Sequence, residues 1–315
     1  TKTGDKLLGE SSEYVLPSPE FPETIMSMAV NPKTKADVDK IMPALQKLMD
    51  EDPVLEVHRD EQTGEFILSG LGQLHIEIAV DRLKRRFGVE VELKTPKVPY
   101  KETITGSCRV QGKHKKQTGG HGQYGDCWIK VEPLERGQGF EFVNAIVGGV
   151  IPKQYIPAVE KGIVESMQNG PLTGNPVVDV KVTLDFGSYH EVDSSEMAFK
   201  IAGSLAFKKA MEECRPILLE PIMNITVVVP EESMGDVMGD LNSRRGKIEG
   251  MNARGKYQEL KAQVPLAEVL TYAPNLTSMT SGRGTYTMSF SHMEPVPYNI
   301  QEKIVAEVKA ARDGK

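Results

Sequence analysis

Residues 113–125 (KHKKQTGGHGQYG) combine the residue types that bind phosphate and nucleobases. Four glycines fall within seven positions, and they free the backbone for close approach to a partner. Lysines attract phosphate, exposed amides donate to phosphate oxygens, and Tyr124 or His121 can stack on a base. A flexible turn with solvated charges is the alternative interpretation. We favour RNA contact, because ordering so many glycines costs free energy and calls for a function.

A second polar segment, residues 186–195 (FGSYHEVDSS), precedes a predicted helix that begins at Glu196. Asp193 or a neighbouring serine is expected to cap this helix. Tyr189 and His190 are expected to be exposed, where His190 can hydrogen-bond a sugar or phosphate or stack on a base.

Ser188, His190 and Asp193 also permit a different chemistry, that of a Ser-His-Asp hydrolase. No nucleophile elbow accompanies them, and three polar residues in a loop are common. The sequence also lacks a G-x-x-x-x-G-K-[ST] phosphate cradle and an H-E-x-x-H zinc motif. We therefore expect no catalytic residue, nucleotide site, metal site or cofactor in this chain, and we interpret His75 as a structural histidine.

A third segment, residues 241–251 (LNSRRGKIEGM), holds Arg244 and Arg245 at the end of a predicted helix. Cations at this position complement the helix dipole, and they also suit phosphate binding. Both interpretations stay open.

Bulk composition is typical of a soluble, multi-domain protein. The 315 residues predict two or three domains, and no apolar run approaches the ~20 residues of a membrane span. The first residues do not form a signal peptide, and we expect them to be the interior of a longer chain.

The net charge is −6, yet residues 109–130 carry a local net charge of +4 and residues 240–261 carry one of +3. Two local basic regions can meet nucleic acid in spite of the overall charge.

Cysteine usage points to a reducing cytosol. Cys108, Cys127 and Cys214 are widely separated, and no C-x-x-C pair occurs. This count and spacing argue against a disulfide framework and against zinc.

Hydrophobic periodicity predicts the elements that position these segments. The order strand, helix, strand, strand, helix, strand is typical of the split βαβ, ferredoxin-like fold, and it occurs near both ends of the chain. The first set is residues 25–30, 35–49, 55–59, 65–71, 73–87 and 89–93. The second is residues 222–229, a helix from a Ser233 cap to Arg245, then 247–252, 257–264, 266–276 and 285–292.

Between these sets, strands are predicted at 103–110, 127–131 and 177–184, and helices at 154–167 and 196–213, with a last helix at 299–312. In the helix at 73–87, the side chains of Leu74, Ile78, Leu83 and Phe87 are expected to face the core, and Gly88 is expected to end the helix.

Several long segments, in order, resemble the C-terminal half of bacterial elongation factor G, the ribosomal translocase. They are QTGGHGQYG (117–125), GSYHEVDSSEMAFKIAGS (187–204), NSRRGKIEGM (242–251), VPLAE (264–268) and GRGTYTMSF (282–290), with residues 21–30 and LSGLGQLHI (68–76) in addition. The resemblance covers nearly the whole chain.

The resemblance implies an α+β, multi-domain fold in which two ferredoxin-like domains flank a domain similar to the second domain of ribosomal protein S5, with a left-handed βαβ crossover. The implied domains are the end of domain II with a linker (1–22), domain III (23–97), domain IV (98–220), domain V (221–298) and a C-terminal helix (299–315). The GTPase domain would lie outside this chain.

The resemblance also implies partners: the rRNA of both ribosomal subunits and the mRNA–tRNA duplex in the A site, met by a cytoplasmic monomer without membrane contact. GTP and Mg²⁺ would be bound elsewhere in the parent protein, a ribosome-dependent GTPase. Two loops at the tip of domain IV would contact the duplex and nearby rRNA, and domain V would contact rRNA of the large subunit. The residues that we expect to make these contacts are Lys115, Lys116, Gly119, Gly120, His121, Gly122, Gln123, Ser188, Tyr189, His190, Arg244, Arg245 and Arg283.

Some positions depart from the translocase pattern. His121 stands where an arginine is expected, Phe186 stands where an aspartate is expected, and Trp128 follows the first loop. The segment YAPNL (272–276) replaces a YATDL-like sequence. These departures resemble the elongation-factor-G-like paralogues, so a role in ribosome recycling or ribosome protection is the alternative to translocation.

Overall fold

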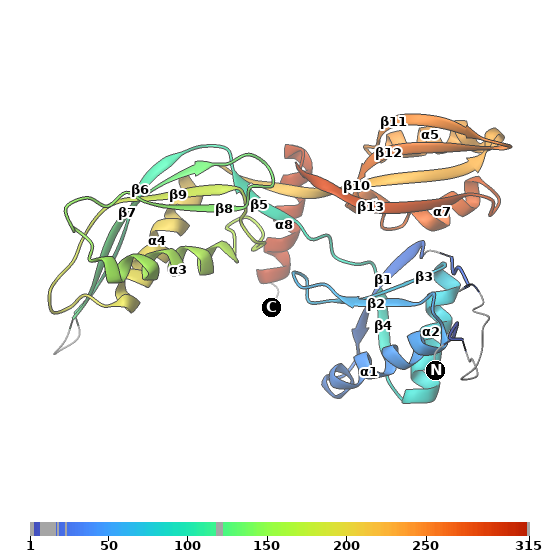
Figure 1. The fold of residues 1–315 in the computed structure, drawn as a ribbon, viewed down its shortest axis with the longest axis horizontal. Coiled ribbons are helices and arrows are strands. Elements are labelled where there is room, and N and C mark those ends of the chain that lie inside the picture. The colour runs from blue at the N-terminus through green and yellow to red at the C-terminus, as the bar shows by residue number, and fades with distance from the viewer. Residues whose placement is uncertain (1–2, 7–16, 18, 23, 118–121, 314–315) are drawn as a thin grey trace. The chain divides into compact units, whose positions relative to one another are not determined.

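The computed structural model describes residues 3–6, 17, 19–22, 24–117 and 122–313 (Figure 1). The chain divides into two compact units, one formed by Thr1–Pro99 with Ile222–Ser291 and the other by Tyr100–Pro221 with His292–Lys315. No helix in the described part of the chain is both long enough and apolar enough to cross a membrane.

The first unit contains a four-stranded antiparallel sheet in the order β2-β3-β1-β4, packed on two helices. Its core includes Val30, Ile41, Leu68 and Leu83. Gly88 ends α2 in the left-handed conformation, as predicted. The bounds are β1 Met26–Pro32, α1 Lys35–Glu51, β2 Glu56–Arg59, β3 Phe66–Gly70, α2 Gln73–Phe87 and β4 Val91–Lys94.

The same unit contains most of a second sheet, in which the order β11-β12-β10-β13 repeats this topology, and a fifth strand, β5 (Lys101–Ile104), pairs with the first residues of β10. In both sheets the first strand lies between the third and the fourth, so the predicted fold class, α+β with repeated ferredoxin-like order, is confirmed. The bounds are β10 Pro216–Pro230, α5 Met234–Ser243, β11 Lys247–Arg254, β12 Tyr257–Pro265, α6 Leu266–Val269, α7 Tyr272–Met279 and β13 Thr285–Pro295.

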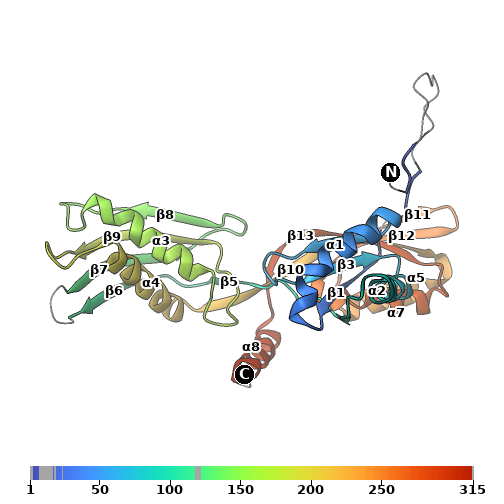
Figure 2. The same ribbon diagram turned by 90° about the horizontal axis from the view of Figure 1, so that it is seen from below.

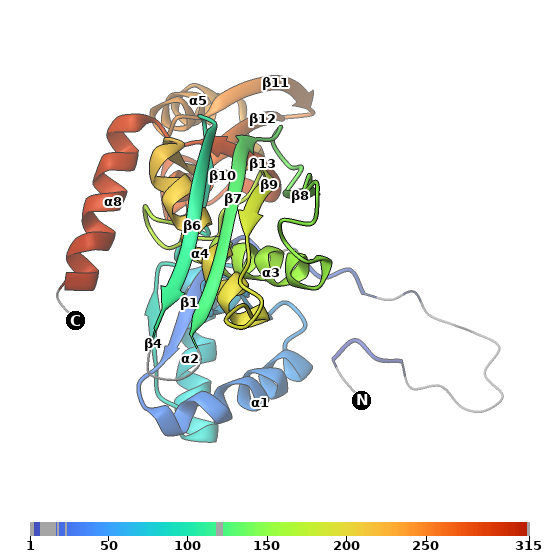
Figure 3. The same ribbon diagram turned by 90° about the vertical axis from the view of Figure 1, so that its left-hand side faces the viewer.

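The second unit has a mixed sheet in the order β6-β7-β9-β8, in which only β8 and β9 run parallel. Helices α3 and α4 cover one face of this sheet (Figures 1 and 2). Strands β6 and β7 form a long antiparallel hairpin (Figure 3). The bounds are β5 Lys101–Ile104, β6 Cys108–Lys116, β7 Gln123–Pro133, β8 Phe140–Asn144, α3 Ile156–Met167, β9 Val180–Ser188, α4 Glu196–Glu213 and α8 Tyr298–Asp313.

The structure corrects the predicted core face of α2. Ile76, Ala79 and Leu83 are buried, whereas Leu74 is 69% exposed and Ile78 is 43% exposed. A helix packed on a sheet buries one stripe of its surface, and Leu74 and Ile78 lie beside that stripe. His75 is the structural histidine that we expected, since its ring bonds the Leu71 amide and the Asp52 carboxylate.

Other predicted elements also differ in detail. Ser233 makes no capping hydrogen bond and instead ends a short 3-10 turn before α5. The single helix expected at 266–276 is two helices, α6 and α7. Pro274 falls in the first turn of α7, where a missing N–H costs no helical hydrogen bond. Strand β8 has no counterpart among the predicted elements.

Glycines set the distance between α4 and the sheet. A Cβ atom at Gly112 of β6 would lie 2.1 Å from the Ala202 carbonyl oxygen, and one at Gly125 of β7 would lie 2.4 Å from that of Ala198. Gly162 of α3 meets the α4 backbone in the same way. Helix α4 therefore lies directly on backbone, at a separation that no larger residue allows.

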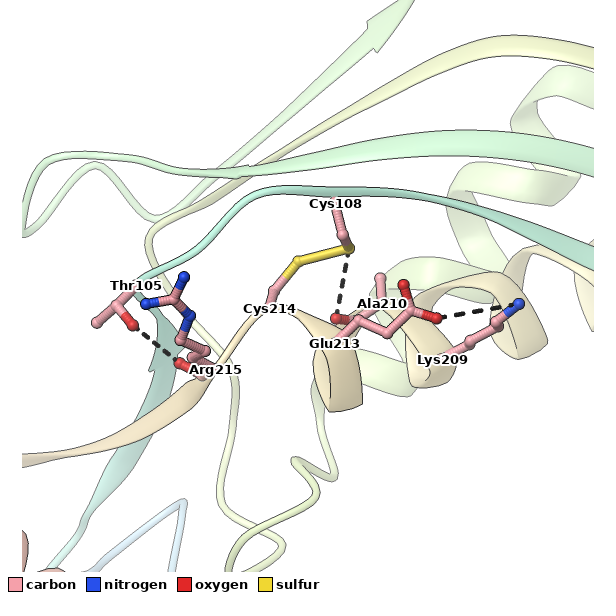
Figure 4. Close-up of a disulfide and its surroundings, with 7 residues drawn as sticks. All are labelled: Thr105, Cys108, Lys209, Ala210, Glu213, Cys214 and Arg215. Carbon is pink, nitrogen blue, oxygen red and sulfur yellow. Dashed lines mark hydrogen bonds and ion pairs between the residues drawn. A yellow bond between two sulfur atoms is a disulfide. The ribbon is translucent and has the colours of Figure 1, made fainter.

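Two cysteines contradict the expectation that no disulfide forms. Cys108, at the start of β6, is bonded to Cys214, which follows the last residue of α4, and their Cα atoms are 5.9 Å apart (Figure 4). They are 106 positions apart in sequence, but α4 lies along β6 and brings its C-terminus to the first residue of that strand. Cys127 is free and buried.

We expect thiol counting to report this arrangement. Burial raises the pKa of Cys127 to about 12, so the native oxidised chain should not react with a thiol reagent at pH 8. Denaturant alone should release one reactive thiol, and denaturant with reductant should release three. Three reactive thiols without reductant would contradict the pairing. Reduction should lower the free energy of unfolding by ~2–4 kcal/mol, and a C108S/C214S variant should show no such effect.

Gly112→Ala should destabilise the second unit by ~2–3 kcal/mol, because the new methyl group must displace α4 from the sheet. The matched control is Gly239→Ala in α5, where no atom lies within 4 Å of the added Cβ atom. That control should be neutral or should stabilise its helix by up to ~1 kcal/mol. Thermal unfolding measures both, and equal effects would refute the packing argument.

Candidate nucleic-acid interface

The β6–β7 hairpin carries the first predicted segment at its end. Its register runs from Cys108 opposite Val131 to Lys116 opposite Gln123. Lys115 and Lys116 are the last residues of β6 and are exposed, and the Gln123 side chain bonds the ring of His114 at 2.9 Å. Gly119, Gly120 and His121 lie outside the described residues, so their roles remain predictions.

The second segment lies against the first. Asp193 accepts a hydrogen bond from the Gly122 amide at 2.9 Å through its side chain, and its carbonyl accepts one from the Tyr124 amide at 2.8 Å. The Ser194 hydroxyl donates to the Tyr124 carbonyl at 2.9 Å. These three bonds join two segments that are some seventy positions apart in sequence.

Two of the four glycines in the first segment have packing roles inside the chain. A Cβ atom at Gly122 would lie 2.9 Å from the Asp193 carboxyl group, so a side chain there would disturb the bond between the segments. Gly125 belongs to β7 and lies under α4. The sequence interpretation assigned all four glycines to a partner, but these two are explained without one.

His190 has a defined orientation. Its Nδ1 atom accepts hydrogen bonds from the amides of Val192 at 3.3 Å and Asp193 at 3.2 Å, while its own amide donates to the Ser194 hydroxyl. These two bonds assign the proton of the neutral ring to Nε2, while the same Nδ1 atom also lies 3.5 Å from an Asp193 carboxylate oxygen. The side chain is 57% exposed, so it offers an N–H donor to the surroundings.

Two expectations for the second segment are confirmed. Tyr189 and His190 are exposed. Ser195 caps α4, since its hydroxyl accepts the Ala198 amide.

Ser188 is not arranged as a nucleophile. Its hydroxyl donates to the Asp126 carboxylate at 2.7 Å and lies 2.7 Å from the Tyr124 hydroxyl. Asp126 is 5% exposed and also accepts from Gln111. The described contacts of Ser188 do not include His190, so the geometry lacks the serine–histidine bond that a hydrolase requires. Asp126, which the sequence interpretation missed, supports Ser188 from below the surface.

The arginines predicted to contact RNA in the other unit all have partners within the chain. Arg244 bonds the Asp240 carboxylate and the Glu268 carbonyl, lies over the Tyr272 ring, and is only 14% exposed. Arg245 pairs with Glu268, and Arg283 pairs with Glu232. Because these contacts bury the Arg244 guanidinium, little of it is accessible to another molecule. The Arg283 side chain, in contrast, is 51% exposed.

Asp193→Ala should uncouple the two segments. Loss of the Asp193 carboxylate removes the partner of the Gly122 amide, so we expect hydrogen exchange at Gly122 to accelerate by ~10-fold or more, as the lost bond no longer protects it. The matched control is Glu191→Ala, which changes an exposed carboxylate of the same segment. Unchanged exchange in Asp193→Ala, or equal acceleration in both variants, would contradict the coupling.

Comparison with known proteins gives the relationship of this chain. Family models match three consecutive stretches: elongation factor G domain III at residues 21–95, elongation factor G domain IV at 96–215, and the elongation factor G C-terminus at 217–304. A crystal structure of a protein from Thermus thermophilus is 47% identical, with a TM-score of 0.82 over 98% of this chain. The chain spans 45% of that protein's length. This chain belongs to the elongation factor G family.

Proposed function

We propose that this chain is the ribosome-binding part of a translational GTPase of the elongation factor G type, and that it promotes GTP-dependent translocation of tRNA and mRNA. Family membership supports the proposal. The observation that carries it is the set of hydrogen bonds that joins Gly122 and Tyr124, at the end of the hairpin, to Asp193 and Ser194 of the second segment. We call these joined residues, with the exposed ends of the two segments beside them, the tip. A tip of this kind can enter a confined site and keep its shape there.

In the proposed mechanism the tip contacts the codon–anticodon duplex while it moves. Lys115 and Lys116 attract phosphates, and the Nε2–H group of His190 donates to a phosphate, sugar or base oxygen. These contacts do not depend on base identity, which suits a factor that must act at every codon. The bonds made by Asp193 and Ser194 keep the two segments from separating under load.

GTP and Mg²⁺ belong to the GTPase domain that the family implies in the longer protein. The chain has no P-loop sequence, so its residues do not fit the nucleotide. The proposed contribution of this chain is RNA contact alone. We further propose that it acts as a monomer in the cytoplasm, and that Arg245 and Arg283 lie near rRNA of the large subunit.

The second candidate is a paralogue that acts in ribosome recycling or ribosome protection. Two of the departures from the translocase pattern support it, because Trp128 and Phe186 are register partners on β7 and β9. These two residues therefore lie side by side on one surface of the sheet. Such a protein would show ribosome-dependent GTPase activity in the parent without rapid translocation.

His190→Ala in the full-length parent should reduce the rate of single-round translocation by ~10-fold or more, because the outward N–H donor is lost at the tip. Glu191→Ala is the matched control and should leave the rate unchanged. Normal translocation by His190→Ala would refute the tip mechanism. If the unmutated parent hydrolyses GTP on ribosomes but does not translocate, the paralogue role is correct instead.

A further inference from the structure

Among the described residues of the second unit, no helix of that unit packs on one face of its sheet, which we call the uncovered face. Helices α3 and α4 lie on the other face, where Gly112 and Gly125 point (Figures 1 and 2). Alternation along β6 places Arg109, Lys113 and Lys115 on the uncovered face. The side chains of this face are exposed or half-buried, except for Asp126.

On this face, the Arg109 guanidinium lies 4.7 Å from the centre of the Trp128 ring. The guanidinium also forms two hydrogen bonds to the Asp185 carboxylate, at 2.7 Å and 3.1 Å. The Trp128 ring and the two hydrogen bonds to Asp185 fix the plane of the guanidinium. The Arg109 side chain is nevertheless 49% exposed. The result is a flat, pre-ordered guanidinium surface whose charge is paired with Asp185.

Phe186 lies beside this surface because of an irregularity in the sheet. The register between β7 and β9 shifts so that Ile129 faces Leu184 while the adjacent Trp128 faces Phe186. The extra residue, Asp185, is the partner of Arg109. Phe186 is therefore on the uncovered face, and it is 48% exposed. An exposed phenylalanine next to a held guanidinium offers two stacking surfaces side by side.

Two lysine side chains lie along β6 between Arg109 and the end of the hairpin. Lys113 lies over the Tyr124 ring at 5.7 Å, and Lys115 follows two positions later. Neither lysine forms an ion pair with the described residues, and both are exposed. Asp126, the acidic residue opposite Lys113, is buried and bonded to Gln111 and Ser188. The free charge along β6 is therefore positive.

We propose that this open face binds single-stranded RNA, with nucleobases stacked on Phe186 and Arg109 and phosphates near Lys113 and Lys115. Stacking surfaces in a row with cations are the two components of sequence-tolerant single-strand binding. A protein partner would need an apolar patch to bury, whereas Phe186, at 48% exposed, is the one large apolar side chain in the exposed class among the described residues of this face. The choice of RNA also rests on the proposed function, since β6 and β7 run from this face directly into the tip.

The chain provides its own reporter. Trp128 is its only tryptophan and lies against Arg109, within the proposed site. The 315-residue chain is titrated with a ~12-nucleotide oligouridylate at ~50 mM salt while Trp128 emission is followed. We expect saturable quenching. An RNA duplex of the same length should bind at least ~10-fold more weakly, because its bases are already stacked.

Phe186→Ala is the principal variant, since its exposed ring contributes little to folding. It should raise the Kd for oligouridylate by ~10-fold or more, and Phe186→Tyr should stay within about 2-fold of the unmutated chain. The matched control is Arg59→Gln, which removes an arginine stacked on Phe66 in the other unit and should change nothing. Far-UV circular dichroism checks that each variant is folded.

Three outcomes would overturn the proposal: no saturable quenching, equal affinity for Phe186→Ala and the unmutated chain, or an equal loss in Arg59→Gln. Weaker ribosome association of Phe186→Ala without any oligouridylate binding would assign the face to a protein partner and would also overturn it. If the unmutated chain fails to bind ribosomes but still shows quenching that depends on Phe186, the proposed function fails and this inference stands.

Discussion

Helix α4 rests on the backbone of β6 and β7, and this contact determines the rest of the second unit. Gly112 and Gly125 leave no side chain between helix and sheet, so backbone contact sets the distance between α4 and the strands. Its N-terminus, capped by Ser195, is then held next to the end of the hairpin, and its C-terminus is held next to the start of β6. The first consequence is the junction of the two tip segments. The second is the pairing of Cys108 with Cys214.

Two carboxylates stabilise the tip in different ways. Asp126 is buried in the sheet and orders Ser188 and Gln111 through short hydrogen bonds. Asp193 lies at the surface and holds the Gly122 amide of the opposite segment. A buried carboxylate with satisfied hydrogen bonds adds rigidity, whereas a surface bond between segments keeps them together. Together they fix Gly122 and Ser188 in place at the end of the hairpin.

The two faces of the β6–β9 sheet are chemically different. The covered face needs glycine and apolar residues because α3 and α4 pack there at close range. The open face is free of that constraint, and it carries Arg109, Trp128 and Phe186 in contact or in register. Trp128 and Phe186 are register partners on this face.

Local patterns in the sequence determined the elements. Helix α2 and helix α4 begin and end where periodicity and caps predict, and the ferredoxin-like order follows from them. Exposure of Tyr189 and His190 also follows from local composition. Tertiary structure decided which helical stripe is buried, so Leu74 and Ile78 were misplaced, and it decided the cysteine pair, the bulge that turns Phe186 outward and the bond from Asp193 to Gly122. Each of these joins residues distant in sequence or depends on what packs above a surface, and periodicity along one chain segment contains neither kind of information.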